Sequence, residues 1–315
     1  MLKKSNQIVI PQLNLFELTN LEIESLFMPF VESEFSLSDP RWEKIVNENK
    51  LFWHRKYLQR ILLGWTNLIG VKTQKNVETD YSLQWAHTTL KQNIDSTKTA
   101  PCIWGKRSFL ARPYGIKRVH QFLLAKFIET TKPKSILEVG SGNGLNLFIL
   151  SSLFPAIQFS GCELTKGGYE ASKKIALEDT LPDYICKFSP LVPLDLKAHK
   201  LINFRQGSAK NLPYDDDAFD IVFTVLALEQ MEEIRNQALS ELSRVCKKYI
   251  VMVEPFRDWN NMATNRHRIA SLDYFSARVA DLSKYGLKPL GMFDNIPNKL
   301  HYSANFLVVE KIEQI

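Results

Sequence analysis

The spacing of apolar and polar residues differs between the two parts of the chain. Up to about residue 130, apolar positions recur every three or four residues, which is typical of helices. From residue 135 onward, short apolar runs alternate with helical stretches, which predicts strand–helix units around a mostly parallel sheet. No apolar run approaches the roughly 18 to 20 residues of a membrane-spanning helix. We therefore predict an α/β protein with a mainly helical N-terminal region.

Four stretches of the first part have helical spacing: 12–35 (one or two short helices), 41–65, a segment near 82–92, and 116–130. The second is expected to begin at Ser38-Asp39-Pro40. Its apolar residues spread around the helix, which favours burial between neighbours over a position on a membrane surface. Apart from the helix near 82–92, residues 66–113 are predicted to be irregular.

Seven apolar runs predict strands, at 136–139, 158–163, 202–206, 219–224, 249–253, and near 288–293 and 303–310. The last two have only a short connection without a helix, so they are expected to pair as an antiparallel hairpin at one edge. The predicted fold is a doubly wound, mostly parallel seven-stranded α/β sheet with this C-terminal hairpin. The link 179–200 contains three prolines and is predicted to be an inserted loop or lid.

The charge distribution changes this picture only slightly. Forty basic and 34 acidic residues give a net charge of +6, which suits an anionic partner but also fits an ordinary solvated surface, the interpretation we prefer. Residues 41–110 hold 12 basic and 5 acidic residues, so the excess lies before the predicted sheet. Polar residues near the start of the chain break up the apolar run that a signal peptide would need. We therefore expect a cytosolic protein. The four cysteines and six histidines lack metal-ligand spacing, so we expect reduced thiols and no metal.

The strongest motif is SILEVGSGNG, residues 135–144, a buried strand followed by Gly140, Gly142 and Gly144. Glycines let the backbone turn sharply and approach a ligand, and the helix that follows offers free N–H groups to a negative group. A dinucleotide-binding turn would need glycine at Leu145, and it seldom has an acid at the position of Glu138. The motif therefore predicts a different nucleotide-like cofactor.

Three further features follow in order. The second strand ends at Glu163-Leu164, where a carboxylate can accept hydrogen bonds from ribose hydroxyls. Gly207-Ser208-Ala209 follows the third strand, and the stretch from Leu226 to Met231 follows the fourth and is expected beside the cofactor. The order of the four features is more specific than any one of them.

In this order the motifs resemble the class I S-adenosylmethionine-dependent methyltransferases, in particular the broad group of ubiquinone-type and small-molecule methyltransferases, over roughly residues 116–310. The resemblance implies S-adenosylmethionine as cofactor, with Glu163 holding the ribose and Leu164 packing on the adenine. The other cofactor-binding residues it implies are Glu138, Gly140, Gly142, Gly144, Ser208, Ala209 and Leu226. Two positions depart from the family: Ser208 replaces an Asp that usually reads the adenine, and Gln230 replaces the histidine of a common Leu-Glu-His.

Methyl transfer from a sulfonium is an in-line displacement with a good leaving group, so alignment matters most, and a general base is needed only for an acceptor that holds its proton tightly. Candidate residues facing the acceptor are Glu229, Gln230, Glu254 and His267, with Arg112 and Tyr114 as candidate acceptor-binding residues. Each has a structural alternative: a helix cap or ion pair for the two glutamates, a helix start for Gln230, and simple exposure for His267.

The chain is predicted to divide into an acceptor-recognition region, 1–115, and a cofactor-binding domain, 116–315. The preferred function is methyl transfer to an O or N atom of a small molecule or sugar, with the first 110 residues and the link 179–200 forming the acceptor pocket. RNA, DNA or protein acceptors are an alternative, disfavoured because strand four lacks the Asn/Asp-Pro-Pro-aromatic motif. A non-enzymatic partner subunit is a third hypothesis, against which the intact glycine motif argues. The acceptor and the oligomeric state cannot be read from the sequence.

Overall fold

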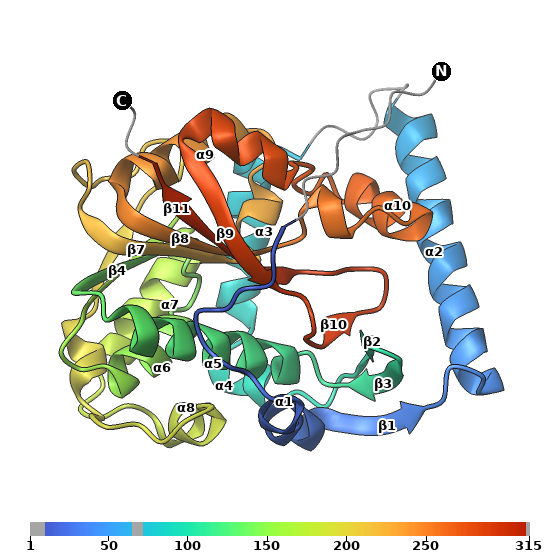
Figure 1. Cartoon of the computed structure of the whole chain (residues 1–315), viewed down its shortest axis with the longest axis horizontal. Coiled ribbons are helices and arrows are strands. Elements are labelled where there is room, and N and C mark those ends of the chain that lie inside the picture. Colours follow the sequence, from blue (N-terminus) through green and yellow to red (C-terminus); the bar gives the residue numbers. More distant parts are fainter. Residues whose placement is uncertain (1–9, 65–71, 313–315) are drawn as a thin grey trace.

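The computed structural model describes residues 10–64 and 72–312, and its main feature is a seven-stranded sheet (Figure 1). The strands are β4 (Ser135–Val139), β5 (Gln158–Glu163), β6 (Asn203–Gln206), β7 (Phe219–Val225), β8 (Cys246–Glu254), β9 (Leu287–Phe293) and β11 (Asn305–Lys311). Their order is β6-β5-β4-β7-β8-β11-β9. The first five are parallel, and β11 is antiparallel to β8 and β9. The predicted doubly wound sheet and its C-terminal hairpin are confirmed.

Both faces of the central strands are buried, as their continuous apolar runs require. The covering helices are α5 (Tyr114–Thr131), α6 (Leu145–Leu153), α7 (Lys166–Ala176) and α9 (Arg235–Val245), with the 3-10 helix η5 (Val279–Tyr285). Neighbouring residues of one strand enter different cores: Ile136 packs in the core that contains α5 and α6, and Leu137 in the core that contains α9 and η5. Figure 1 shows α5 and α6 on one side of the sheet and α9 on the other.

A second, four-stranded antiparallel sheet was not predicted. Its strands, in spatial order, are β1 (Val31–Phe35), β3 (Arg107–Ala111), β2 (Ala100–Trp104) and β10 (Asn298–Lys299). The prediction of helix through residue 35 and of irregular structure across the β2–β3 hairpin is therefore wrong, because strand pairing overrides local spacing there. The connection predicted to be short runs from β9 through β10 before it returns at β11. This sheet combines three strands from before residue 115 with β10 from after it. The predicted division of the chain at residue 115 therefore stays a prediction.

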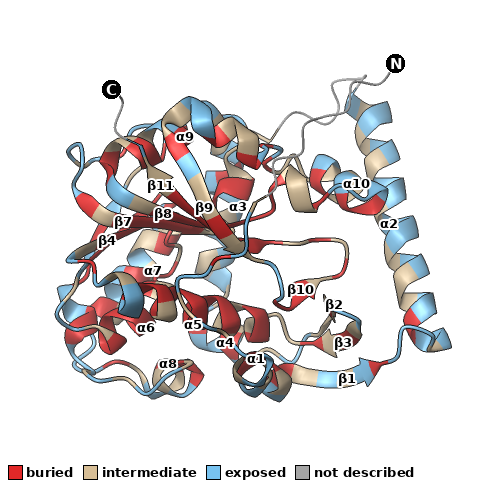
Figure 2. Ribbon diagram, in the orientation of Figure 1, coloured by how far each residue is buried: buried red, intermediate tan, exposed pale blue. Residues whose placement is uncertain are grey.

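The N-terminal helices are α1 (Asn20–Phe27), α2 (Pro40–Gly64), α3 (Gln74–His87) and α4 (Leu90–Ile94). The start of α2 at Pro40 is confirmed, whereas its predicted end at residue 65 and the polar start of the chain, residues 1–9, lie outside the described residues. The predicted burial of α2 is wrong. Only Trp42 among its residues is buried, and Leu62 is 68% exposed (Figure 2). One face packs on α10 (Ala263–Ser271), and the first turns pack on the second sheet through Trp42, but these neighbours leave most apolar residues of the helix uncovered.

The segment 179–200 folds onto the body of the protein. It contains α8 (Asp183–Phe188) and the start of the 3-10 helix η2 (Ala198–Leu201), and α8 packs against α4 and α6. Within residues 10–64 and 72–312, no helix has both the length and the apolarity of a membrane span.

Candidate functional site

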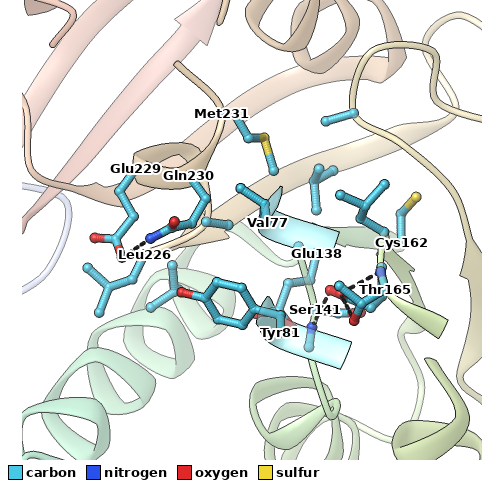
Figure 3. A pocket seen from close by; sticks show the side chains of 18 of the residues that line it. Val77, Tyr81, Glu138, Ser141, Cys162, Thr165, Leu226, Glu229, Gln230 and Met231 are labelled. Atoms are coloured by element: carbon cyan, nitrogen blue, oxygen red, sulfur yellow. Dashed lines mark hydrogen bonds between the residues drawn. The ribbon is translucent and has the colours of Figure 1, made fainter. Parts of the chain in front are cut away.

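A cavity of about 410 Å³ lies at the carboxyl ends of β4, β5 and β7 (Figure 3). Chain connections leave β4 and its neighbours in opposite directions here, which is where doubly wound folds bind ligands. Its walls are the turn after β4, the end of β5, the loop after β7 and one face of α3. This volume lies in the range of small-molecule sites.

The glycine turn after β4 keeps this cavity open. All three glycines have positive φ angles, +76° at Gly140, +53° at Gly142 and +82° at Gly144. A Cβ on Gly140 would lie 2.5 Å from the Cβ of Ala227, and one on Gly142 would lie 3.1 Å from the Trp85 ring. Gly144 does not line the cavity; it begins α6, and a Cβ there would meet two phenylalanine rings. Gly140 and Gly142 therefore shape the cavity, whereas Gly144 serves helix packing.

Glu163 ties the glycine turn to the end of β5. Its Oε2 accepts the N–H of Gly142 at 2.8 Å, and its Oε1 accepts the N–H of Thr165 at 2.9 Å and the Thr165 hydroxyl at 2.6 Å. A carboxylate offers about four acceptor positions, so about one remains for a ribose hydroxyl and not the two that we expected. Leu164, the next residue, also lines the cavity, and its packing on an adenine stays a prediction.

Glu138 presents a free oxygen to the cavity. The side chain is buried, and Oε1 accepts a hydrogen bond from the Asn146 amide at 2.7 Å. No described residue pairs with Oε2. Burial raises the pKa of Glu138 to about 8, although the Asn146 hydrogen bond opposes this shift. A cation that binds beside this carboxyl group would therefore stabilise its ionised form.

The donor set fits the cofactor that the resemblance implies. S-adenosylmethionine carries an ammonium group, which matches the free oxygen of Glu138, and a ribose diol, which matches the remaining acceptor position of Glu163. The backbone of Gly140 and Gly142 has no Cβ where the cofactor would approach. Leu164 and Ala209 line the cavity where the resemblance expects the adenine.

Both positions that depart from the family contact the segment that leads into α3. The Ser208 hydroxyl accepts a hydrogen bond from the Gln74 side chain, and Gln230 Oε1 accepts one from the Lys72 ammonium group. Glu233 also accepts the backbone N–H of Gln74. Ser208 does not line the cavity itself, whereas Gln74 and Gln230 do. Ser208 and Gln230 therefore help to hold α3 in its position over the cavity.

We expect the contact between Gln74 and Ser208 to support cofactor binding. Gln74→Ala and Ser208→Ala should each weaken binding about 3- to 10-fold, and the double variant should lose little more, since a hydrogen bond of this kind contributes about 1 kcal/mol. Calorimetric titration of the four proteins measures the coupling. Gln237→Ala, an exposed glutamine on α9, is the control. Strictly additive losses would show that the two side chains act separately.

The Glu254 carboxylate, at the end of β8, holds the loop after β7. It accepts the N–H groups of Ala227, Leu228 and Glu229 at 3.0, 3.1 and 3.2 Å. Leu226 adopts a φ of +54°, rare for a side chain of this size, and lines the cavity. Glu254 does not line the cavity. Its hydrogen bonds fit the structural alternative, in which it caps the backbone N–H groups of this loop.

Glu229 is a second buried carboxyl group in the cavity wall, and the part of the cavity around it, with Tyr274 and Lys299, is where we expect the acceptor, hereafter the acceptor end. It is 6% exposed, and Oε1 accepts a hydrogen bond from Gln230 Nε2 at 2.9 Å (Figure 3). In the part of the chain that the structure describes, Oε2 has no partner. Burial raises the pKa of Glu229 to about 7, against the Gln230 hydrogen bond and the charges of Lys299, Arg268 and Lys72. The group can therefore accept a proton near neutral pH.

Three predicted acceptor residues lie outside the cavity. His267 stacks on Tyr57 of α2, with ring centroids 4.4 Å apart. The Arg112 guanidinium lies over the Phe30 ring and donates to a backbone carbonyl, and Tyr114 packs on a phenylalanine of α8. The geometry does not support a direct role for them. The link 179–200, expected in the acceptor pocket, also contributes no lining residue.

Sequence reasoning missed the lining residues from distant segments: Val77, Tyr81 and Trp85 of α3, Lys117 of α5, Tyr274, and Lys299 of β10. The α3 segment was predicted to be mostly irregular. One signal of its position was the Gly167-Gly168 pair at the start of α7, where added Cβ atoms would lie 3.0 Å from Ser82 O and 3.1 Å from Trp85 Nε1. Paired glycines at a helix start indicate the close approach of another element.

Comparisons with known proteins agree with this site. A family model described as a methyltransferase domain matches residues 137–252. The uncharacterized methyltransferase YcgJ of Bacillus subtilis is 28% identical over 127 residues, which are 40% of this chain and 42% of YcgJ. The phthiotriol/phenolphthiotriol dimycocerosates methyltransferase of Mycobacterium tuberculosis is 28% identical over 116 residues, 36% of this chain and 34% of that protein.

The crystal structure of YcgJ aligns with a TM-score of 0.42 at 16% identity, and covers 62% of this chain and 98% of that one. The chain spans less than half the length of the curated relatives it matches. Residues 137–252 therefore carry the match to a methyltransferase domain, in agreement with the motifs that line the cavity.

Proposed function

We propose that the protein is a methyltransferase that transfers a methyl group to an O or N atom of a small-molecule acceptor. The observation that carries the proposal is Glu229, a buried carboxyl group with a free oxygen beside the cofactor-binding turn. The cover that α3 forms over the cavity favours a small acceptor over RNA or protein, because a large acceptor would have to displace this helix.

Bound S-adenosylmethionine supplies an electrophilic methyl group on a sulfonium. Glu138 would bind the ammonium group, and Glu163 would hold a ribose hydroxyl while it keeps the glycine turn in place. Leu164 and Ala209 would flank the adenine. These residues fix the position of the reacting end, which is the main requirement for an in-line displacement.

The residues of the acceptor end orient the acceptor and move its proton. Glu229 Oε2 would accept the proton of an acceptor hydroxyl or ammonium group. Burial raises the pKa of Tyr274 to about 12, and it raises the pKa of Tyr81 as well, so both phenols keep their protons and can donate hydrogen bonds. Trp85 and Val77 of α3 keep water from this side of the cavity.

Calorimetric titration of the full chain with S-adenosylmethionine and S-adenosylhomocysteine tests the proposal. We expect saturable binding of both, and formation of S-adenosylhomocysteine when a small-molecule acceptor from a mixed panel of alcohols and amines is added. Absence of binding at millimolar cofactor would contradict the proposal and favour a non-enzymatic partner subunit. Binding without turnover on small molecules, but with turnover on RNA or protein, would overturn the acceptor class.

A further inference from the structure

Two lysines face the acceptor end of the cavity from distant parts of the chain. Lys117 comes from α5 and Lys299 from β10, and both line the cavity together with Glu229 and Tyr274. Lys299 is held firmly, because its strand pairs with Cys102 of β2 and the next N–H, that of Leu300, donates to a carbonyl of β2 at 2.8 Å. Both lysines are thus fixed parts of the cavity wall.

Neither lysine is neutralised inside the protein. Among residues 10–64 and 72–312, no carboxylate lies within salt-bridge distance of either ammonium group. The Lys117 ammonium lies over the Tyr114 ring, 4.7 Å from its centroid. Burial lowers the pKa of both lysines, and the charges of Arg268 and Lys117 lower that of Lys299 further. Both side chains are half-buried, and withdrawing an unpaired ammonium group from water costs free energy, so a partner that enters the cavity is expected.

Positive and negative groups lie together around this part of the cavity. The positive groups are Lys72, Lys117, Arg268 and Lys299, and the carboxyl groups coupled to them or to one another are Glu138, Glu163, Glu229 and Glu254. Burial raises the pKa of Glu138 to about 8 and that of Glu229 to about 7, so these carboxyl groups are partly protonated near neutral pH. The Arg268 guanidinium lies over the rings of Trp53 and Tyr302 and donates to the Leu300 carbonyl, and no carboxylate of the described residues lies within salt-bridge distance of it.

Resting on the methyltransferase function proposed above, we propose that the acceptor carries an anionic group, a carboxylate or a phosphate, which Lys117 and Lys299 bind at one end of the cavity. The carboxylate of the cofactor is the competing occupant. Lys117 is close enough to both Glu138 and Glu229 for their charges to raise its pKa, whereas only Glu229 of the two acts on Lys299. We therefore expect Lys299 on the side of Glu229, away from Glu138 and the cofactor ammonium group that we propose for it, so that its substitution separates the two occupants.

Titration of the full chain with benzoate, phenyl phosphate and the neutral benzamide, with and without saturating S-adenosylhomocysteine, tests the proposal. We expect one of the anions to bind at least 10-fold more tightly than benzamide, and the better anion identifies the group. Lys299→Met should weaken anion binding at least 10-fold while the affinity for S-adenosylhomocysteine changes less than 2-fold. Lys117→Met is the second variant, and Lys288→Met, an exposed lysine of β9, is the matched control.

Equal binding of benzoate, phenyl phosphate and benzamide would overturn the proposal, as would unchanged anion binding in both cavity variants. A parallel loss of S-adenosylhomocysteine affinity in Lys299→Met would assign the lysine to the cofactor instead. Because an unpaired, half-buried charge is removed, the melting temperature of this variant should not fall, which separates a binding role from a structural one. If the wild-type chain fails to bind S-adenosylhomocysteine, the proposed function fails, and the titration without it still tests the anion site.

Discussion

Gly140→Ala is expected to abolish cofactor binding. Gly140 has a φ of +76°, and an added Cβ would lie 2.5 Å from the Cβ of Ala227, a distance that two methyl groups cannot adopt. Both residues line the cavity, and Ala227 is held by the Glu254 carboxylate, so the backbone must shift at the point where the cofactor enters. The substitution therefore closes the cavity and strains the turn together.

We expect the affinity for S-adenosylmethionine to fall at least about 100-fold, and the free energy of unfolding to fall by about 2–4 kcal/mol. Gly105→Ala is the matched control. Gly105 also has a positive φ, +58°, but an added Cβ there has no neighbour within 4 Å. This control should lose only the roughly 1 kcal/mol of a left-handed alanine and keep its affinity. Urea unfolding and calorimetry measure both quantities, and near wild-type affinity in Gly140→Ala would refute the close approach.

The central strands of the main sheet could be predicted because each is a short apolar run that is buried on both faces. β4, β5 and β7 begin within one residue of their predicted positions. The failures occur where the environment of a segment is set by distant residues. β10 is two residues long and exists because it pairs with β2, which lies far earlier in the chain. The spacing of α2 could not reveal that one neighbouring helix covers only part of its surface.

The same distinction applies to the site. Glu138, Glu163 and Leu226 follow strands directly, and the carboxyl ends of parallel strands meet at one edge, so local motifs place them in one cavity. Tyr81 and Lys299 reach it from elements whose position depends on tertiary packing. From the sequence, Ser208 and Gln230 could be interpreted only as departures from the family pattern. Their partners, Gln74 and Lys72, lie far away in the sequence, so these hydrogen bonds could not be predicted.

Glu229→Gln is expected to lower kcat about 100-fold or more for an acceptor that must lose a proton, the usual range for a general base. The amide keeps the size of the side chain but cannot take the proton. In the wild type, kcat/KM should rise with pH through about 7, where the Glu229 carboxyl group ionises, and this rise should vanish in the variant. Release of S-adenosylhomocysteine across pH 5–9 measures both. An unchanged pH profile in the variant would show that the general base is a residue other than Glu229.

The stability of Glu229→Gln gives an independent test that needs no acceptor. The pKa of Glu229 lies near 7 in the folded protein and near 4.5 in the unfolded chain, so between these values the folded state holds a proton that the unfolded state has released. This contribution to stability is complete below about pH 4.5 and is lost as the pH rises through 7, at up to about 1.4 kcal/mol per pH unit. The variant should therefore gain stability relative to the wild type as the pH rises from 5 to 8. Glu129→Gln, an exposed glutamate of α5, should show no such gain in urea unfolding. If Glu229→Gln behaves like this control, the carboxyl group is ionised at neutral pH and the raised pKa that the mechanism requires does not exist.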